Sequence, residues 1–339
     1  MCPEIVARSP GCKERGGPKN GAYLDVCEDF RRDPRRRRLG PQQISGHILA
    51  DKVEMLMALM LGGCTPTPGR RHFMGRVIAV ANQKGGVGKT TTAVNLSASL
   101  AVAEKRVLLV DMDPQGNATS GLGHARQSAG AEGGSVYDVI IGRRTIADVT
   151  QSTELPFLKL VPSGQDLAGA EIELVGLPGR ETKLREPLRL VALDYDFIIV
   201  DTPPSLGLLT LNALCAADGV LVPLQCEYYA LEGLSDLRAT VNLVGRSLNP
   251  GLDIEGIILC MVDMRQNLAE QVSSEVRKHF GDKVYDTPIP RNVRLSEAPS
   301  FGKPILLYDV ASKGAKSYME AAREFITRHT REAEGTGSP

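Results

Sequence analysis

The 339-residue sequence contains no tryptophan, and aromatic residues make up only 4% of it. It has no run of 18 apolar residues, so we expect no helix that spans a membrane. Lysine plus arginine and aspartate plus glutamate each number 40. This balance excludes a uniformly basic nucleic-acid binder. Hydrophobic residues, at 42%, are numerous enough for a large core, which excludes wholesale disorder.

The zero net charge hides an asymmetry between two parts of the chain. Residues 1–73 carry 13 Lys/Arg against 8 Asp/Glu, a net charge of +5. Residues 74–339 carry 27 against 32, a net charge of −5. A local basic patch on the second part is still compatible with these numbers.

The seven cysteines show no metal-binding or disulfide pattern. No pair has CxxC spacing, and the five histidines are scattered. We therefore expect a reduced, cytoplasmic protein without a zinc framework. The last three cysteines stand in apolar contexts and are predicted to be core residues. The cysteines are Cys2, Cys12, Cys27, Cys64, Cys215, Cys226 and Cys260.

The first 73 residues lack apolar periodicity, and glycine and proline break the chain at residues 62–69. Two interpretations are open: a basic arm that binds DNA or a partner, or a poorly ordered extension, including a mis-assigned start upstream of Met74. We favour the second. The catalytic domain is then predicted to span residues 74–330, followed by a flexible tail at 331–339.

From residue 76 onward, short apolar runs alternate with helical stretches. This alternation predicts a doubly wound α/β domain with a mostly parallel sheet. Such folds bind ligands at the carboxyl ends of their strands. The predicted strands are residues 77–81, 107–111, 158–161, 197–200, 220–222 and 257–262, and the clearest predicted helices are 90–103, 206–217, 231–244 and 268–280.

A glycine-rich loop, NQKGGVGKTT, occupies residues 82–91 after the first predicted strand. Its glycines let backbone N–H groups converge on phosphate oxygens. Lys89 is expected to reach the β- and γ-phosphates, and the Thr90 hydroxyl to bind Mg²⁺. The strict P-loop pattern has glycine where this chain has Gln83, and Lys84 is an additional cation. The predicted nucleotide-binding residues here are Lys84, Gly85, Gly86, Val87, Gly88, Lys89, Thr90 and Thr91.

Acidic residues end two further predicted strands. Asp111 and Asp113 follow the second strand, and strand alternation predicts that both face the same side. Asp201 ends an apolar strand of Walker B form. One acid could bind metal-bound water while another orients the attacking water. The three strand ends together predict hydrolysis of a nucleoside triphosphate, and the candidate magnesium residues are Thr90, Asp111 and Asp201, with the two acids acting through water.

These motifs resemble the deviant Walker A ATPases, specifically the ParA/Soj chromosome-partitioning branch. The resemblance covers residues 75–330, and nothing comparable covers residues 1–73. The segments that carry it are 84–91, 111–117 and 201–204, together with 170–174, 225–233 and 289–300.

The resemblance implies an ATP-dependent homodimer with ATP and Mg²⁺ as cofactors. In that dimer Lys84 would reach across to the phosphates of the partner chain. Asp113 matches the acid that is essential for hydrolysis, and Asp111 would belong to the metal shell. Pro290 and Asn292 match the positions that face adenine.

The resemblance also implies non-specific DNA binding by the ATP-bound dimer and release upon hydrolysis that a ParB-like partner stimulates. Arg265 and Arg294 are the implied DNA contacts, with Lys313 and Lys316 as weaker candidates. The protein would then act in the cytoplasm, associated with the nucleoid, in chromosome or plasmid partitioning.

Two alternatives need other surfaces. A MinD-like ATPase would lie on a membrane through its last helix, but the apolar face of the C-terminal sequence is too small for this, so we expect no membrane binding. A ParA-like ATPase could instead position another cargo, such as a polysaccharide or chemotaxis cluster, without binding DNA. The same nucleotide site would serve either function.

Overall fold

The computed structural model describes residues 75–126, 132–263, 265 and 267–335. The predicted extension at residues 1–73 lies outside these residues, as do the last four residues of the predicted tail. Everything below concerns the described part of the chain.

One seven-stranded sheet forms the centre of the fold, in the order β3-β4-β2-β5-β1-β6-β7. Neighbouring strands are parallel except β3, which pairs antiparallel to β4 at one edge. The strands are β1 (Arg76–Val80), β2 (Val107–Asp111), β3 (Gln151–Ser152), β4 (Leu158–Val161), β5 (Phe197–Asp201), β6 (Gly219–Gln225) and β7 (Ile254–Cys260).

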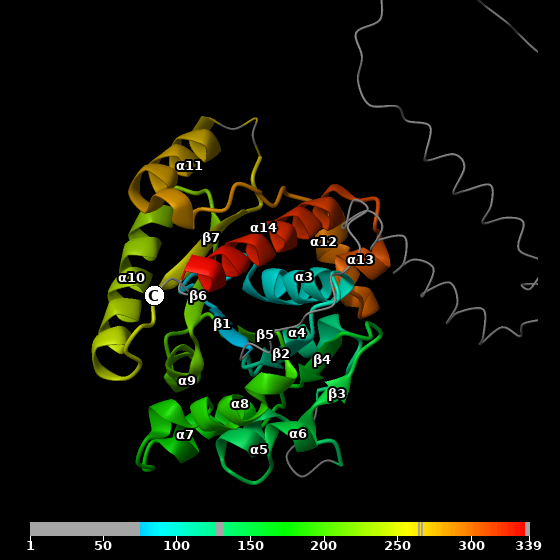
Figure 1. The fold of residues 1–339 in the computed structure, drawn as a ribbon, viewed down its shortest axis with the longest axis vertical. Helices are drawn as coiled ribbons and strands as arrows, with labels where there is room; N and C mark the ends of the chain where they lie inside the picture. Colours follow the sequence, from blue (N-terminus) through cyan, green and yellow to red (C-terminus); the bar gives the residue numbers. More distant parts are fainter. Residues whose placement is uncertain (1–74, 127–131, 264, 266, 336–339) are drawn as a thin grey trace, which may run out of the picture. The chain divides into compact units, whose positions relative to one another are not determined.

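Helices connect the strands and cover both faces of the sheet (Figure 1). The α-helices are α3 (Lys89–Val102), α4 (Asn117–Gly121), α5 (Val136–Ile140), α6 (Ile146–Val149), α7 (Leu167–Leu174), α8 (Arg185–Val191), α9 (Leu208–Ala216), α10 (Ala230–Ser247), α11 (Asn267–Phe280), α12 (Val293–Glu297), α13 (Ile305–Tyr308) and α14 (Lys313–Gly335). Short 3₁₀ turns are η2 (Arg180–Thr182), η3 (Ala192–Asp194), η4 (Gly281–Lys283) and η5 (Ala298–Phe301).

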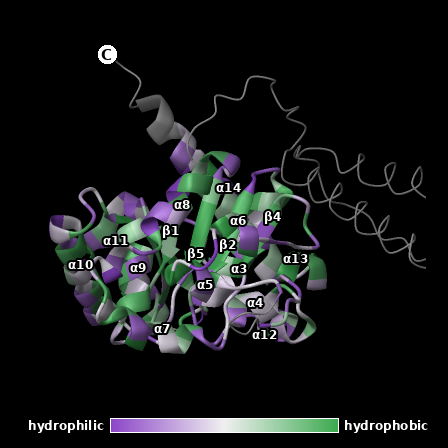
Figure 2. Cartoon of the chain, turned by 90° about the horizontal axis from the view of Figure 1, so that it is seen from below, coloured by the Kyte–Doolittle hydropathy of each residue, from purple (hydrophilic) through white to green (hydrophobic). Residues whose placement is uncertain are grey.

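The central strands are apolar because helices bury both of their faces. Every residue of β2 and β5 is buried, and the same strands are coloured as hydrophobic in Figure 2. Continuous apolar runs therefore specify these positions in the sheet. Each of the two runs ends in an aspartate, and a buried charge at a strand end needs a special environment.

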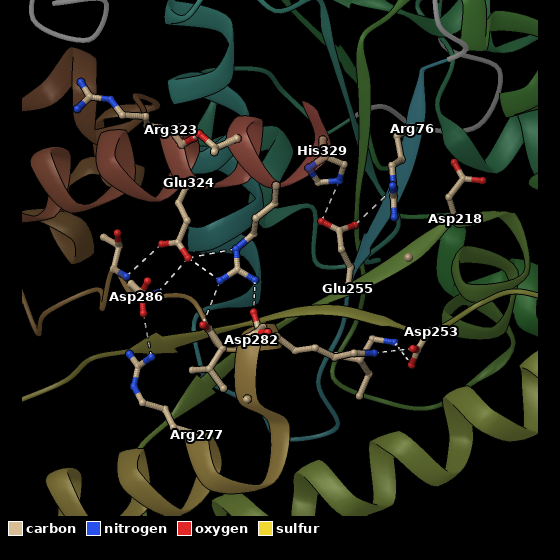
Figure 3. Close-up of a pocket in the computed structure, with 18 of the residues that line it drawn as sticks. Arg76, Asp218, Asp253, Glu255, Arg277, Asp282, Asp286, Arg323, Glu324 and His329 are labelled. Carbon is tan, nitrogen blue, oxygen red and sulfur yellow. Dashed lines mark hydrogen bonds and ion pairs between the residues drawn. The ribbon is translucent and has the colours of Figure 1, made fainter. Parts of the chain in front are cut away.

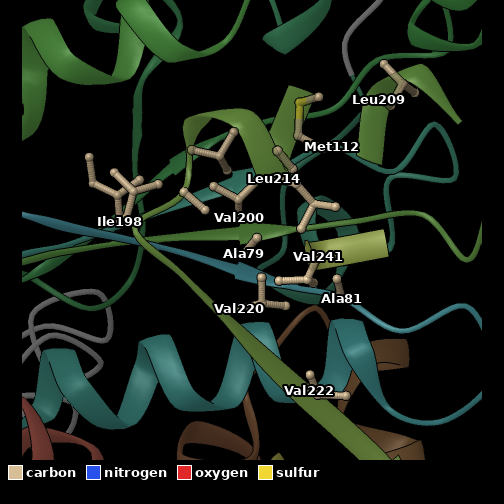
Figure 4. Close-up of a cluster of buried hydrophobic side chains, with 14 of the residues drawn as sticks. Ala79, Ala81, Met112, Ile198, Val200, Leu209, Leu214, Val220, Val222 and Val241 are labelled. Carbon is tan, nitrogen blue, oxygen red and sulfur yellow. The ribbon is translucent and has the colours of Figure 1, made fainter. Parts of the chain in front are cut away.

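Buried side chains join the sheet to the helices. Figure 4 shows strand residues packed together with residues of α9 and α10. Across the sheet, α3 packs against β1, β2, β5 and β6, and α14 packs on α3 (Figure 1). The residues that Figure 4 labels are Ala79, Ala81, Met112, Ile198, Val200, Leu209, Leu214, Val220, Val222 and Val241.

The apolar face of α14 is turned into the protein. Tyr318, Ala321, Ala322 and Phe325 are at most 1% exposed. The helix thereby uses its apolar stripe for packing on α3, as expected for an amphipathic helix of a globular domain. Among the described helices, none is long and apolar enough to cross a membrane.

The predicted fold class, a doubly wound α/β domain with a mostly parallel sheet, is confirmed. The strand and helix positions agree within three residues, and the largest differences are at the start of β7 and at the ends of β6 and α10. The sequence did not predict β3, which has only two residues. Helix α14 continues to Gly335, so the backbone is helical over the first five residues of the predicted tail.

The packing of α14 predicts a large cost for removing Phe325. Its ring lies 5.0 Å from the Phe197 ring and 4.2 Å from the His329 ring. We expect Phe325→Ala to lower the free energy of unfolding by about 3–5 kcal/mol in urea denaturation, because it leaves a cavity. Leu243→Ala, at a side chain on α10 that is 66% exposed, should change it by less than about 0.5 kcal/mol. Equal effects of the two substitutions would contradict this packing.

Candidate functional site

The polar segments that follow β1, β2 and β5 lie around one cavity of about 720 Å³. The cavity is at the carboxyl edge of the parallel sheet, where doubly wound folds bind ligands. A fourth segment, around residues 289–296, also lines it. The predicted site residues that line the cavity are Gly85, Gly86, Gly88, Lys89, Thr90, Thr91, Asp113, Pro290 and Asn292.

Four other predicted site residues are not among the residues that line this cavity. Val87, Asp111 and Asp201 are buried, at most 1% exposed. The side chain of Lys84 is 44% exposed. The predicted nucleotide- and metal-binding residues thus fall into three groups: residues that line the cavity, buried residues, and the exposed Lys84.

The loop between β1 and α3 presents backbone to the cavity. Gly86 and Gly88 have φ angles of 74° and 95°, a region that residues with a Cβ rarely adopt. No side chain caps α3, so the N–H groups of its first turn are available to a ligand. Asn82 fixes the loop: its amide donates to the Pro223 carbonyl at 2.8 Å, and its Oδ1 accepts from Lys84 N at 3.0 Å.

The two lysines of this loop have different surroundings. Lys89 is 7% exposed, and its Nζ donates to the Lys84 carbonyl at 3.0 Å. Burial lowers the pKa of Lys89, and the carboxylates of Asp201 and Asp113 oppose this shift. Its ammonium group is thus placed to bind phosphate oxygens. Lys84, in contrast, forms an ion pair with Glu227.

Asp111 and Asp201 lie opposite each other on adjacent strands, and both are 0% exposed. The oxygens of Asp111 are in use: Oδ2 accepts from the backbone N and the hydroxyl of Thr119, both at 2.7 Å, and Oδ1 accepts from Asp113 N at 3.1 Å. Neither oxygen of Asp201 has a hydrogen-bond partner of good geometry among the described residues, and only the nearby Thr90 hydroxyl and Lys89 ammonium favour its charged form. An unpartnered carboxylate at this depth is costly without a cation.

Burial shifts the pKa values of both acids upward. It raises the pKa of Asp111 to about 6, although the hydrogen bonds from Thr119 oppose the shift. Burial likewise raises the pKa of Asp201 well above its ordinary value, and the charge of Asp111 adds to this. The ammonium group of Lys89 offsets part of the cost of two negative charges on this pair, and a bound cation would offset more.

The donor set fits a magnesium ion held mainly by Asp201 and Thr90. Mg²⁺ prefers oxygen ligands, keeps several waters, and is commonly bound through one or two carboxylates plus phosphate oxygens. Asp201 offers two unpartnered oxygens, and Thr90 lines the adjoining cavity. No cluster of three or more His, Cys, Asp or Glu side chains in the described chain is arranged to hold a metal. Phosphate oxygens and water would have to complete the shell.

Asp113 reaches the cavity by a different route from the one that strand alternation predicts. Strand β2 ends at Asp111, so Asp113 lies in the following turn. Its Oδ1 accepts a hydrogen bond from Gln115 N at 2.9 Å. This turn places its carboxylate at the cavity, whereas Asp111 stays beneath it.

The turn that contains Pro290 and Asn292 is attached to the end of β7. Val262 N donates to the Ile289 carbonyl at 3.0 Å. Asn292 caps α12, since its Oδ1 accepts from Arg294 N at 2.8 Å. This capping role, which the sequence analysis did not include, leaves the amide N–H groups of Asn292 for other acceptors.

The two predicted DNA contacts are exposed but paired within the chain. Arg265 binds Asp263 through Nε and Nη2, both at 2.9 Å, and its side chain is 89% exposed. Arg294 lies 2.9 Å from Glu297 and 3.5 Å from Asp309. A DNA phosphate would have to compete with these carboxylates for each guanidinium.

Several residues that line the cavity were not predicted as site residues, and Cys260, Met261 and Tyr318 among them lie outside the motifs that the sequence indicated. Met261 has a φ of 53°, an uncommon conformation for this residue. Tyr318 comes from α14, and its hydroxyl lies 3.1 Å from the Thr92 hydroxyl. No sequence signal marks Tyr318, because its approach depends on how α14 packs over α3.

The described cysteines, Cys215, Cys226 and Cys260, are free and buried, which confirms the prediction that they are core residues. Burial raises the pKa of Cys260 to about 12, so this thiol stays protonated near neutral pH.

A larger cavity, of about 1250 Å³, lies at the opposite edge of the sheet, at the amino ends of β1 and β7 (Figure 3). Acidic and basic side chains in its walls form ion pairs, and some of these pairs link α14 to neighbouring elements. None of the predicted site residues lines it, so we interpret it as a structural network. The pairs are Arg277–Asp286 at 3.3 Å, Lys283–Asp253 at 2.5 Å, Arg328–Glu324 at 2.6 Å and the buried pair His329–Glu255 at 3.0 Å.

Comparisons with known proteins agree with this geometry. A family model described as an AAA domain matches residues 75–254. The chromosome partitioning protein ParA of Myxococcus xanthus is 58% identical over 257 residues, which cover 76% of this chain and 90% of that protein. The sporulation initiation inhibitor protein Soj of Bacillus subtilis is 58% identical over 251 residues, 74% of this chain and 98% of that protein.

A solved structure with the same fold contains a nucleotide. The cobyrinic acid a,c-diamide synthase of Mycobacterium smegmatis, with bound ADP and magnesium, has a TM-score of 0.66 and 38% sequence identity. The match covers 77% of this chain and 97% of that one.

The unpartnered Asp201 predicts a substitution that stabilises the protein without its ligands. Asp201→Asn keeps the shape but removes the charge. We expect the free energy of unfolding to rise by about 1–3 kcal/mol at pH 8 in urea denaturation without nucleotide or metal. The gain should shrink toward pH 5. The pKa of the Asp201 carboxyl is raised in the folded protein, so this group is protonated at low pH. As the pH rises through the raised pKa, the carboxyl ionises and the wild-type protein loses stability.

Asp111→Asn is the matched control. An amide has one acceptor oxygen, whereas the Asp111 carboxylate accepts three hydrogen bonds on two oxygens. We expect this substitution to lower the free energy of unfolding by about 1–3 kcal/mol. Equal effects of the two substitutions would contradict the assignment of Asp201 as the carboxylate that lacks hydrogen-bond partners.

Proposed function

Because the chain belongs to the ParA/Soj family of chromosome-partitioning ATPases, we propose that it is a nucleotide-controlled switch that moves DNA. It hydrolyses ATP with Mg²⁺ as cofactor. Its ATP-bound dimer binds DNA non-specifically and leaves the DNA after hydrolysis that a ParB-like partner stimulates. The observation that carries the proposal is the buried, unpartnered Asp201 beside a phosphate-binding loop.

Different residues would bind the phosphates, the metal and the adenine of the nucleotide. The backbone N–H groups from Gly85 to Thr91 would bind the phosphate oxygens, and Lys89 would add a positive charge beside them. Thr90 and Asp201 would hold the metal, with Asp111 adding negative charge beneath. When bound, Mg²⁺ neutralises charge between the β- and γ-phosphates. On the other side of the cavity, Pro290 and the Asn292 amide would contact adenine.

Asp113 is the proposed residue for hydrolysis. It lines the cavity and is 5% exposed, and its Oδ1 is fixed by Gln115 N. A carboxylate at this position can accept a hydrogen bond from water and orient it toward the γ-phosphate. Lys84 would place a further positive charge beside the phosphates that the second chain binds. A site that depends on a second chain and a partner favours slow intrinsic turnover.

Exposed apolar side chains near the cavity support the proposed dimer. Three large ones stand in the segments that follow β5 and β6, at the edge of the sheet where the cavity lies, and a fourth, at the start of α12, lines the cavity. Monomeric proteins seldom expose such groups together unless they mark an interaction surface. The residues are Leu206, Tyr228, Tyr229 and Val293, between 38% and 76% exposed.

DNA binding has to be reconciled with a net charge of −5 for residues 74–339. Non-specific DNA affinity comes from several contacts with phosphate, each of which releases counterions. Arg265 and Arg294 would supply two of them on each chain, and dimerisation would double the number. The protein would act in the cytoplasm, on the nucleoid.

The alternative function is the positioning of another cargo without DNA. One observation favours it: both predicted DNA contacts already have carboxylate partners in the single chain. The nucleotide cycle would be the same, and only DNA binding separates the two proposals. Because the apolar face of α14 is buried inside the protein, we do not expect this helix to attach the protein to a membrane.

Asp113→Ala is predicted to separate nucleotide binding from hydrolysis. ATP affinity should stay within about twofold, while the hydrolysis rate falls by at least about 100-fold. The substituted chain should then remain on DNA as long as ATP is present. Phosphate release and the DNA-bound fraction measure these two effects. Asp236→Ala on α10 is the control, and hydrolysis at the wild-type rate in Asp113→Ala would refute the assignment.

Substituting the proposed DNA-binding arginines should weaken binding without affecting the dimer. For Arg265→Ala and for Arg294→Ala, we expect the slope of log affinity against log salt to fall by about one for each phosphate that the protein no longer binds. Arg189→Ala, on α8, which lies well away from α11 and α12, removes the same charge and should leave the slope unchanged (Figure 1). An unaltered slope in an Arg265 or Arg294 variant would eliminate that residue as a DNA-binding residue.

A further inference from the structure

The loop between β6 and α10 contains a charged residue that the nucleotide site described above does not use. Glu227 stands in this loop, and its Oε2 forms an ion pair with Lys84 Nζ. The contact joins two segments far apart in the sequence. Beside it stand the exposed rings of Tyr228 and Tyr229, packed edge to face at 5.0 Å.

Backbone hydrogen bonds hold both sides of this ion pair. Glu227 N donates to the Gln225 carbonyl at 2.9 Å, and Ala230 N donates to the Glu227 carbonyl at 2.9 Å. Lys84 N donates to Asn82 Oδ1, and the Lys84 carbonyl accepts from Lys89 Nζ. The pair therefore restrains the Lys84 side chain without requiring the loops to move.

The ammonium group of Lys84 is thereby kept outside the cavity, whose described lining does not include Lys84. We propose that Glu227 is a positioning residue for Lys84: it holds the ammonium in the free chain and releases it when the phosphates of a second copy arrive. This inference rests on the proposed ATP-dependent dimer. Glu227 then sets how much ATP the chain needs to dimerise.

The strength of the ion pair suits such an exchange. The side chains of Lys84 and Glu227 are 44% and 46% exposed, so water screens their attraction. An exposed pair of this kind contributes little and opens readily. A triphosphate carries more charge than one carboxylate and offers several acceptor oxygens, so it can displace Glu227 from the ammonium.

The experiment measures the dimer fraction of the full chain by sedimentation, over a titration with a non-hydrolysable ATP analogue and Mg²⁺. Glu227→Gln removes the charge and keeps the shape. We expect its half-maximal dimerisation at an analogue concentration about two- to tenfold below wild type, because two weak pairs must open in each dimer. Affinity for the analogue, measured at chain concentrations too low for dimers, should not change.

Two further variants test whether the charge of Glu227 is responsible. Glu232→Gln removes an exposed carboxylate from the first turn of α10, next to this loop, and should dimerise like wild type. Glu227→Asp keeps the charge on a shorter side chain and should restore most of the wild-type threshold. A purely structural effect of position 227 would not follow the charge in this way.

Three results would overturn the proposal. Glu227→Gln could match Glu232→Gln, which would show that the ion pair does not restrain Lys84. It could need more analogue than wild type, which would place Glu227 among the contacts of the dimer. A wild-type chain that binds the analogue yet stays monomeric would refute the proposed dimer itself, and this inference with it.

Discussion

The buried carboxylates of Asp111 and Asp201 lie at the centre of the nucleotide site, on adjacent strands of the sheet. Parallel pairing of β2 and β5 sets the two acids opposite each other, out of contact with water. Thr119 and the backbone of residue 113 satisfy Asp111, while Asp201 keeps two unpartnered oxygens. The fold therefore maintains an arrangement that is unfavourable alone and becomes favourable when a cation is bound. Charged groups at functional sites commonly trade stability for binding in this way.

The same arrangement explains how nucleotide binding can act on the whole chain. Lys89 lies near both Asp201 and Asp113, and the loop before it is fastened to β6 through Asn82. A ligand that brings phosphate and metal would satisfy the lysine and the carboxylate together. Lys84 starts from the same loop but is held on the surface by Glu227. One short segment thus connects the interior of the site with the surface that would meet a second chain.

Much of this was predictable from the sequence, since apolar strands that end in aspartate and a glycine-rich loop are local patterns. They predicted the sheet, the phosphate loop and the two acid-bearing strand ends. The partners of side chains were not predictable. Thr119 satisfies Asp111, Asn292 caps α12, and Tyr318 approaches from the distant α14 only through tertiary packing. Strand alternation gives no basis for placing Asp113, because β2 ends at Asp111.

The measurement that tests the account most directly is binding of the full chain to a duplex of arbitrary sequence, with and without ATP and Mg²⁺, across a series of salt concentrations. We expect binding only when both ATP and Mg²⁺ are present, independent of sequence, and steeply weaker as salt rises. Binding that ignores the nucleotide, or no binding although ATP is hydrolysed, would contradict it. The second result would leave an ATPase that positions a cargo other than DNA.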